Sequence, residues 1–287
     1  MITEKACAKL NISLDVSKPR PDGYHDMIMV MQAVSLCDDI EIEINSSGKV
    51  FAKSNLKYIP SDEKNLAVKA AGLYFEALDN RSAGAVISIR KAIPVGAGMA
   101  GGSTDAAAVI RALNRYYGNA LSPEELLKVA ERTGSDVPFC VLGGTALAEG
   151  RGEILTSLPE IPECTFVICK PEFSISTPEL FKALDRIKLR SHPDTAGIIS
   201  ALENGDLKQI CRRLYNVFED VPDRRMRTVT EIKQKLLSGG AEGAVMTGTG
   251  SAVFGIFTDA EEAYAVCSQL EKDYGFCVCA EPVGKQI

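Results

Sequence analysis

The residue types best suited to chemistry gather in one glycine-rich segment, residues 94–107, with the sequence PVGAGMAGGSTDAA. It follows a predicted strand at 85–89 and leads into a predicted helix at about 105–117, whose Val109, Ile110 and Leu113 form an apolar stripe. Glycines before a helix let backbone N–H groups approach an anion, and the unpaired amides and dipole of the helix attract negative charge. The segment therefore predicts a phosphate-binding loop, since a tight turn does not need four glycines.

Two common nucleotide-binding motifs do not account for this loop. Residues 96–101 match the spacing G-x-G-x-x-G, but the dinucleotide-binding fold requires a strand after the helix, and here a second helix is predicted. The segment also lacks the lysine of a P-loop, and the chain has no H-R-D loop of the protein kinases. The loop therefore indicates another class of phosphate-binding site.

The loop is similar to the motif P-x-x-x-G-L-x-G-G-S-S-D-A-A of the GHMP kinases, which are ATP-dependent kinases of small molecules. Met99 stands in place of the usual Leu, and Thr104 in place of the second Ser. The second glycine motif of the family is present as residues 246–255, MTGTGSAVFG. Residues 8–12, 22–25 and 134–139 resemble the branch of the family that phosphorylates the 2-hydroxyl of diphosphocytidyl methylerythritol.

This resemblance implies an ATP-dependent kinase acting on that acceptor. The alternatives are a GHMP kinase with another acceptor, such as homoserine or mevalonate, and a non-catalytic nucleotide-binding protein. The family pattern gives the chemistry to Asp136, which would take the proton of the acceptor hydroxyl, and to Lys9, which would counter the charge of the γ-phosphoryl group. From the residues alone, Asp136 also fits a helix N-cap and Lys9 a solvated strand residue.

The resemblance also implies which residues hold the two substrates. Tyr24 and Phe181 would stack on the cytosine ring, a contact worth about 1–3 kcal/mol per base, while His25 and Asn11 would bind its edge or position the substrate. Mg²⁺ is expected with the nucleotide, with Ser103 as its protein ligand. The residues expected to hold ATP are Pro94, Val95, Gly96, Ala97, Gly98, Met99, Ala100, Gly101, Gly102, Ser103 and Thr104, with Asn65 and Lys91 at the adenine or ribose. Those expected to hold the acceptor are Asn11, Tyr24, His25, Thr177, Phe181, Thr247, Gly248, Thr249 and Gly250.

Hydrophobic periodicity predicts the elements that must position these residues. The first strand alternates polar and apolar residues, so Lys9, Asn11, Ser13 and Asp15 are expected on one wet or functional face. Ser122 and Glu125 form a capping box at the start of one helix. Other strands are expected at 27–36, 40–44, 85–89, 243–247, 253–257 and 276–280, and other helices at 64–78, 177–187, 195–203, 206–215, 227–237 and 260–274.

These elements predict an α+β protein with a domain boundary near residues 159–162, where prolines interrupt the pattern. The resemblance implies the two-lobed GHMP kinase fold. In that fold the N-terminal lobe, 1–158, is like domain 2 of ribosomal protein S5 and carries the ATP-binding glycine loop, and the C-terminal lobe, 159–287, is ferredoxin-like.

Composition excludes several classes of protein and partner. With 287 residues, of which 46% are hydrophobic and 24% charged, the chain is a globular protein. The 32 basic and 38 acidic residues give a net charge of −6, which argues against binding to nucleic acid or to a membrane. The resemblance implies small molecules as partners instead, namely ATP and a cytidylyl diphosphate polyol, and we expect a monomer or weak homodimer.

The N-terminus and the cysteines predict a cytoplasmic location. Residues 1–7 lack the apolar core of a signal peptide, and no apolar stretch is long enough to span a bilayer. The nine cysteines show no C-x-x-C spacing, and we expect them to be free structural thiols.

Overall fold

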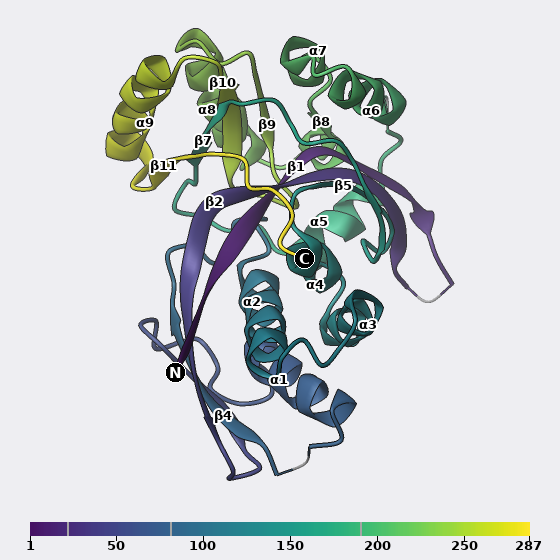
Figure 1. The fold of residues 1–287 in the computed structure, drawn as a ribbon. Helices are drawn as coiled ribbons and strands as arrows, with labels where there is room; N and C mark the ends of the chain where they lie inside the picture. The colour runs from purple at the N-terminus through teal and green to yellow at the C-terminus, as the bar shows by residue number, and fades with distance from the viewer. Residues whose placement is uncertain (22, 81, 190) are drawn as a thin grey trace.

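The computed structural model describes residues 1–21, 23–80, 82–189 and 191–287; Asp22 of the 22–25 motif lies outside the described residues. Figure 1 shows two lobes, with β1 (Ile2–Pro19) and β2 (His25–Asn45) running diagonally through the larger one and into contact with the smaller one. The other strands are β3 (Val50–Ser54), β4 (Gly84–Arg90), β5 (Thr145–Gly150), β6 (Ile154–Ser157), β7 (Thr165–Cys169), β8 (Tyr215–Asn216), β9 (Gly243–Met246), β10 (Val253–Phe257) and β11 (Cys277–Ala280).

Most helices pack against one face of each sheet, whereas α6 (Thr195–Glu203) and α7 (Leu207–Cys211) pack into a second core, between the two sheets. The other helices are α1 (Leu66–Ala77), α2 (Gly101–Tyr116), α3 (Pro123–Thr133), α4 (Val137–Leu142), α5 (Thr177–Leu184), α8 (Met226–Ser238) and α9 (Ala260–Tyr274), with a 3-10 turn at Val217–Asp220. In Figure 1, α1 to α4 lie together in the larger lobe, and α8 and α9 lie against the smaller sheet.

The sheet order confirms the predicted two-lobed α+β fold. Within the described residues, the larger sheet has the order β3-β4-β2-β1-β8, and β5 pairs with β2 and β6 beside it. The smaller sheet is antiparallel with the order β11-β7-β10-β9. Numbered along its own segment, that order is 4-1-3-2 with helices in the two crossovers, which is the ferredoxin-like arrangement.

Local signals place most elements correctly, and tertiary contacts move several boundaries. The capping box of α3 is confirmed, since Ser122 accepts from the Glu125 amide and the Glu125 side chain accepts from the Ser122 amide. Helix α2 begins at Gly101, four residues before the prediction, because the last glycines of the loop are themselves helical. The strands expected at 27–36 and 40–44 are one strand, and the helix expected over 206–215 ends at Cys211, because Tyr215 pairs with Ser13 in the larger sheet.

The expectation that Lys9, Asn11, Ser13 and Asp15 share one face is wrong because β1 is bulged. Its register against β2 shifts between Cys7 and Lys9 and again between Asn11 and Ser13. The even-numbered side chains consequently change cores: Ala6, Leu14 and Val16 pack with the helices of the larger lobe, whereas Ala8, Leu10 and Ile12 pack into the core shared with the smaller sheet. One long strand thereby serves both cores.

The expectation of nine free thiols is also corrected. Cys7 and Cys37 lie directly opposite on β1 and β2 and form a disulfide. The other seven cysteines are free, and six of them are buried. Cys267 of α9 lies close to Cys277 and Cys279, whose side chains share one face of β11, and these two thiols lower the pKa of Cys267. Across residues 1–21, 23–80, 82–189 and 191–287, no group of three or more His, Cys, Asp or Glu side chains is arranged to hold a metal ion.

The predicted boundary at 158/159 falls between β6 of the larger sheet and β7 of the smaller one. Two later segments return to the larger lobe: β8 pairs with β1, and the last residues run along β2 and α4, with bridges from Val34 to Pro282 and from Gly143 to Lys285. The yellow C-terminus therefore ends beside α4 in Figure 1. Within the described chain, no helix combines the length and the apolar content that a membrane crossing requires.

Candidate active site

A cavity of about 480 Å³ lies between the lobes and is lined by both glycine loops. Its walls come from β1, β2, the start of α1, the loop before α2, the start of α4, α5 and the loop after β9. A larger hollow of about 720 Å³ lies among residues of β1, β2, β3 and β4, but it contains no glycine loop and none of the predicted site residues. Chemistry therefore belongs to the cavity between the lobes.

The first glycine loop presents unpaired amides to this cavity. Gly96 and Gly98 have φ values of 66° and 78°, and Ala100 at the N-cap of α2 has φ 58°. A left-handed conformation costs a residue with a side chain about 1–2 kcal/mol, so the loop is strained at Ala100. Within the described residues, no backbone N–H of residues 96–100 donates a hydrogen bond to the protein. These amides and the first turn of α2 form an anion-binding concavity.

The two glycine loops touch each other through their backbones. A Cβ on Gly98 would lie 2.2 Å from the carbonyl oxygen of Thr247, and a Cβ on Gly248 would lie 2.6 Å from the carbonyl oxygen of Gly98. The Thr247 hydroxyl also lies 3.3 Å from that Gly98 oxygen. Only glycine fits at both positions, because any side chain would force the loops apart.

Asn11 ties Lys9 to the second loop. Its Oδ1 accepts from Lys9 Nζ at 2.6 Å and from the Gly248 backbone amide at 3.0 Å, and its backbone N–H donates to the Thr247 hydroxyl at 3.0 Å. Asn11 is fully buried and Lys9 is 4% exposed, yet Lys9 lines the cavity. Among the described residues Asn11 is the single hydrogen-bond partner of Lys9 Nζ, so two of the ammonium protons remain for a ligand.

Asp136 lines the same cavity, and its carboxylate is not used for capping. It occupies the N-cap position of α4, but its backbone is already helical and its side chain makes no capping hydrogen bond. Burial and the Asp136 charge raise the pKa of the Cys140 thiol in the next turn, while Lys9 opposes that rise. The charges of Lys9 and Asp136 therefore both act on the Cys140 thiol. Asp136 therefore stands at the predicted N-cap position, but its side chain does not form the hydrogen bond that an N-cap residue usually makes.

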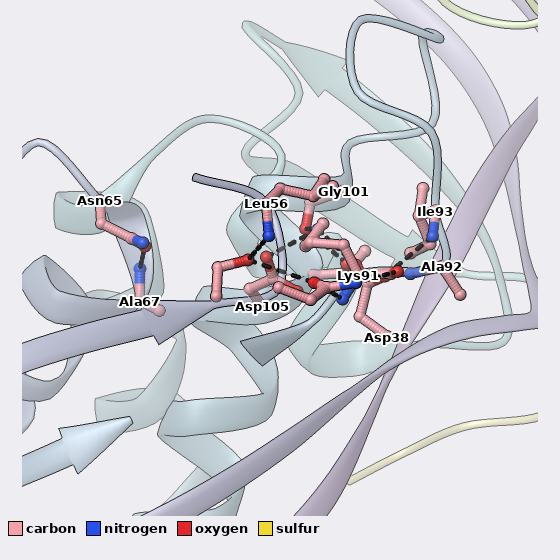
Figure 2. Close-up of polar contacts among 12 residues, drawn as sticks. Asp38, Leu56, Asn65, Ala67, Lys91, Ala92, Ile93, Gly101 and Asp105 are labelled. Carbon is pink, nitrogen blue, oxygen red and sulfur yellow. Dashed lines mark hydrogen bonds and ion pairs between the residues drawn. The ribbon is translucent and has the colours of Figure 1, made fainter. Parts of the chain in front are cut away.

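Lys91 lies beside the first turn of α2 with two buried carboxylates (Figure 2). Its Nζ donates to Asp38 Oδ2, to Asp105 Oδ2 at 2.8 Å and to the Gly101 carbonyl at 3.2 Å. Asp38 Oδ1 accepts the amides of Ala92 and Ile93. Burial raises the pKa of Asp105 to about 7 against the opposing effect of the Lys91 ammonium, and the Asp38 carboxylate adds to the rise.

Aromatic side chains meet at α5, which lines the cavity through Thr177 and Phe181. Phe181 of α5 packs its ring 4.9 Å from the His25 ring and 4.9 Å from the Phe218 ring. His25 Nε2 pairs with Asp185 at 2.8 Å, which fixes the orientation of the imidazole. Tyr24 is 54% exposed, with the Arg151 guanidinium 5.4 Å from the ring centroid.

Most of the predicted site residues line the cavity. They are Lys9, Asn65, Lys91, residues 94–103, Asp136, Thr177, Phe181, Gly248, Thr249 and Gly250. The side chains of Thr177 and Thr249 meet across it at 2.9 Å. The remaining predicted residues, which are Asn11, Tyr24, His25, Thr104 and Thr247, are not among the residues that line it. Asn11, Thr104 and Thr247 are buried behind it.

Several residues of the site escaped the sequence analysis, and three of them form hydrogen bonds with predicted site residues. Asp105 lies within the glycine motif and could have been found from that position. Asp185 is the partner of His25, and Asn216 donates to the carbonyls of Met246 and Gly248 at the base of the second loop. The last two are distant in sequence from their partners, so no local pattern indicated them.

The cavity fits Mg²⁺ bound with a nucleotide. Ser103 is in the first turn of α2 beside the loop amides, and within the described chain its hydroxyl has no protein partner. Mg²⁺ keeps several waters and binds largely through phosphate oxygens, so one protein hydroxyl beside a phosphate cradle suits it.

Comparison with known proteins matches both lobes to one family. The model for the GHMP kinases N terminal domain matches residues 65–144, and that for the GHMP kinases C terminal domain matches residues 198–275. A protein of Clostridium novyi named 4-diphosphocytidyl-2-C-methyl-D-erythritol kinase is 42% identical over 94% of this chain and 96% of its own. A protein of the same name from Exiguobacterium sibiricum is 43% identical over 96% of this chain and 95% of its own.

Solved structures agree with that match. A crystal structure of 4-(cytidine 5'-diphospho)-2C-methyl-D-erythritol kinase superposes with a TM-score of 0.82 and 31% identity, covering 98% of this chain and 99% of the other. A homoserine kinase from Cytophaga hutchinsonii superposes with a TM-score of 0.79 at 21% identity over 99% of this chain and 95% of its own. At that identity the second match shows the fold alone.

Proposed function

The chain belongs to the GHMP kinase family, and we propose that it transfers the γ-phosphoryl group of ATP to the 2-hydroxyl of 4-diphosphocytidyl-2-C-methyl-D-erythritol. The proposal is supported by relatives of that name at 42–43% identity across most of the chain. The observation that carries it is the single cavity in which Lys9, Asp136 and both glycine loops meet beside Phe181. The product of the proposed reaction is a precursor for isoprenoid biosynthesis by the non-mevalonate route.

Asp136 acts as the proton acceptor. The acceptor 2-hydroxyl gives its proton to this carboxylate while its oxygen forms a bond to the γ-phosphorus. The bond between that phosphorus and the β–γ bridging oxygen breaks, and ADP leaves with the electron pair. The reaction needs alignment and charge neutralisation more than covalent catalysis, and a carboxylate that no capping hydrogen bond occupies suits this role.

Lys9 stabilises the transferred group. Asn11 holds Nζ by one hydrogen bond, so the ammonium keeps two donors for phosphoryl oxygens. Asn11 is a positioning residue: it is fully buried and joins Lys9 to the second loop. We assign the phosphates to the amides of residues 96–102, and we assign bound Mg²⁺ to Ser103, where it would neutralise charge on the phosphate oxygens.

The acceptor lies toward Phe181, Thr177 and the second loop. The cytosine ring stacks on Phe181, and Tyr24 closes over it from the rim, where its ring is exposed. His25, held by Asp185, supports Phe181 and binds the edge of the base. The chain acts in the cytoplasm as a monomer or weak homodimer.

An ADP-release assay over a panel of acceptors tests the function. We expect turnover with 4-diphosphocytidyl-2-C-methyl-D-erythritol and none above background with homoserine or mevalonate. Equal turnover with either of those two would show that the acceptor is a different molecule, while the assignment to the GHMP kinase family would stand. ATP binding without ADP release on any acceptor would favour a nucleotide-binding protein that does not catalyse transfer.

A further inference from the structure

Asn216 is a buried amide that joins two segments of the chain beside the active site. It is 2% exposed and is not among the described residues that line the cavity. Its Nδ2 donates to the carbonyls of Met246 at 2.7 Å and Gly248 at 2.8 Å, and its Oδ1 accepts from the Phe218 backbone N–H at 3.0 Å. Both amide protons are therefore donated to the second glycine loop, and none is left for a substrate.

The hydrogen bonds to the loop exceed what the local structure of Asn216 requires. Asn216 is the N-cap of the 3-10 turn Val217–Asp220, and an N-cap needs only the oxygen that accepts from Phe218. The two donated hydrogen bonds reach residues 30 and 32 positions later in the chain. A buried carbonyl without a donor is costly, so these two bonds hold the loop backbone in one place.

Gly248, one of the two residues held in this way, also anchors the side chain that holds Lys9. The Gly248 N–H donates to Asn11 Oδ1 at 3.0 Å, and the same oxygen accepts from Lys9 Nζ at 2.6 Å. Asn216 thus holds Gly248 by its carbonyl, and Asn11 holds it by its N–H. A continuous series of hydrogen bonds therefore runs from Asn216 through Gly248 and Asn11 to the Lys9 ammonium.

The 3-10 turn joins the same amide to an aromatic side chain of the cavity wall. Phe218 lines the cavity, and its ring centroid lies 4.9 Å from that of Phe181. The next residue, Glu219, accepts from the Met246 N–H at 2.8 Å and forms an ion pair with Lys233. Because Glu219 keeps the loop attached to the turn, replacement of Asn216 is expected to shift Gly248 rather than to detach the loop.

We propose that Asn216 is a positioning residue for phosphoryl transfer: it fixes Gly248, and through Gly248 and Asn11 it aims the Lys9 ammonium at the transferred group. This rests on the proposed function for the role of Lys9. Phosphoryl transfer depends on alignment, and a misplacement of about 1 Å can lower the rate about 10²-fold. Asn216 therefore acts on kcat more than on substrate affinity.

The kinetics of Asn216→Ala test this assignment, with ADP release measured on whichever acceptor the wild type phosphorylates. The alanine removes all three hydrogen bonds and leaves Gly248 free to shift. We expect kcat to fall roughly 10- to 100-fold. We expect KM for ATP to change by less than about threefold, because we assign the ATP phosphates to the first glycine loop.

Asn114→Ala is the matched control. Asn114 is 6% exposed and also makes three hydrogen bonds, one with the Tyr74 hydroxyl and two with the backbone of Leu121. It is not among the described residues that line the cavity. This variant should lose stability in denaturant unfolding and keep the wild-type kcat. An equal loss of kcat in the two variants would limit Asn216 to a role in folding and contradict the proposal.

A double-mutant cycle shows whether Asn216 acts through Asn11. Asn11→Ala by itself breaks the series of hydrogen bonds that leads to Lys9. Adding Asn216→Ala to that variant should therefore lower kcat by no more than about twofold further, because residues in one network are not additive. If the two losses of kcat multiply in full, Asn216 does not act through Asn11 and the proposal is wrong.

A wild-type kcat in Asn216→Ala would also overturn the assignment. If that variant does not fold, Asn216→Ser takes its place, because its hydroxyl can donate one of the two hydrogen bonds and kcat should still fall. A crystal structure of the folded variant gives a readout that needs no acceptor. The Gly248 N–H should move away from Asn11 Oδ1, and the Lys9 ammonium should shift with that oxygen.

Unchanged positions of Gly248 and Lys9 in that structure would contradict the proposal. If the wild type phosphorylates no acceptor, the proposed function fails, and the crystal structure still decides whether Asn216 positions Lys9. The failure of the one assignment is therefore distinguishable from the failure of the other.

Discussion

Lys9 and Lys91 are buried lysines on the wall of one cavity, and their hydrogen bonds give them different roles. Lys91 donates all three protons to the protein, whereas Lys9 Nζ donates one, to Asn11. The free donors of Lys9 can serve a phosphoryl group, and Lys91 can only orient its neighbours. The number of ammonium protons already donated to the protein thus distinguishes the roles of two lysines in one site.

At the residue scale, Asp136→Asn should abolish most turnover and leave ATP binding intact. The amide cannot accept a proton at neutral pH, and general-base catalysis contributes typically 10²–10⁴-fold, so kcat should fall by that factor. Turnover by ADP release and ATP affinity by calorimetry measure the two effects. Asp206→Asn, an exposed N-cap of α7, is the control. Wild-type turnover in Asp136→Asn would remove this residue as the base.

Phe181→Ala should weaken the acceptor and spare the nucleotide. Loss of a stacking contact of about 1–3 kcal/mol raises KM for the cytidylyl substrate roughly 5- to 150-fold. KM for ATP should change little, because Phe181 is on α5 and not in the glycine loop to which we assign the ATP phosphates. Phe51→Ala, on the 44% exposed Phe51 of β3, controls for the loss of a phenyl ring. An equal rise in both KM values would refute the stacking role.

At the scale of elements, the two bulges of β1 place Lys9 and Leu14 on the same cavity, although one is odd-numbered and the other even-numbered. A regular strand would put them on opposite faces. The extra residue between Asn11 and Ser13 turns the strand over, so polar chemistry and an apolar wall come from one element.

Gly98→Ala should disturb both glycine loops at once. The new Cβ would collide with the Thr247 carbonyl, and the φ of 78° adds strain, so we expect a loss of roughly 1–3 kcal/mol in unfolding free energy. KM for ATP should also rise. Gly118→Ala is the matched control, since Gly118 has φ 69° and nothing within 4 Å of its Cβ position.

The comparison of the two alanine variants isolates the contact between the loops. Gly118→Ala should show the backbone cost of about 1–2 kcal/mol with an unchanged KM for ATP. If Gly98→Ala shows the same loss of stability in thermal unfolding and the same unchanged KM for ATP, the contact between the loops contributes neither to stability nor to ATP binding.

At the scale of the molecule, the C-terminal segment ties the smaller lobe back to the larger one. After β11, Val283 donates to the Ala33 carbonyl and Gln286 to the Leu142 carbonyl, both at 2.8–2.9 Å. Gln32 Nε2 donates to the Val283 carbonyl at 3.2 Å. The cavity lies between the lobes, so this strap contributes to their relative placement.

Deleting residues 282–287 should therefore lower stability. Removing three hydrogen bonds of about 0.5–1.5 kcal/mol each predicts a loss of roughly 2–4 kcal/mol, measured by denaturant unfolding. Deleting Ile287 alone, which is 41% exposed, is the control. Equal stability of the two truncated chains would show that the strap does not couple the lobes.

Local order in the chain fixed much of this protein. The capping box at Ser122, the helix after the glycine loop and three strands of the smaller sheet follow from neighbouring residues, because capping and periodicity act over a few positions. The sequence analysis does not predict the fourth strand, β7. The phosphate loop is likewise local, since its amides and the helix that follows are contiguous.

The tertiary structure alone decided what each polar residue does. Asn11 meets Thr247 across 236 positions, and Lys91 meets Asp38 across 53. Such contacts depend on how bulged strands and two lobes pack, which no short pattern encodes. The sequence by itself determined that a phosphate would be bound and by which loop. Packing determined which buried donors and acceptors remain free for the substrates, because that depends on partners distant in the chain.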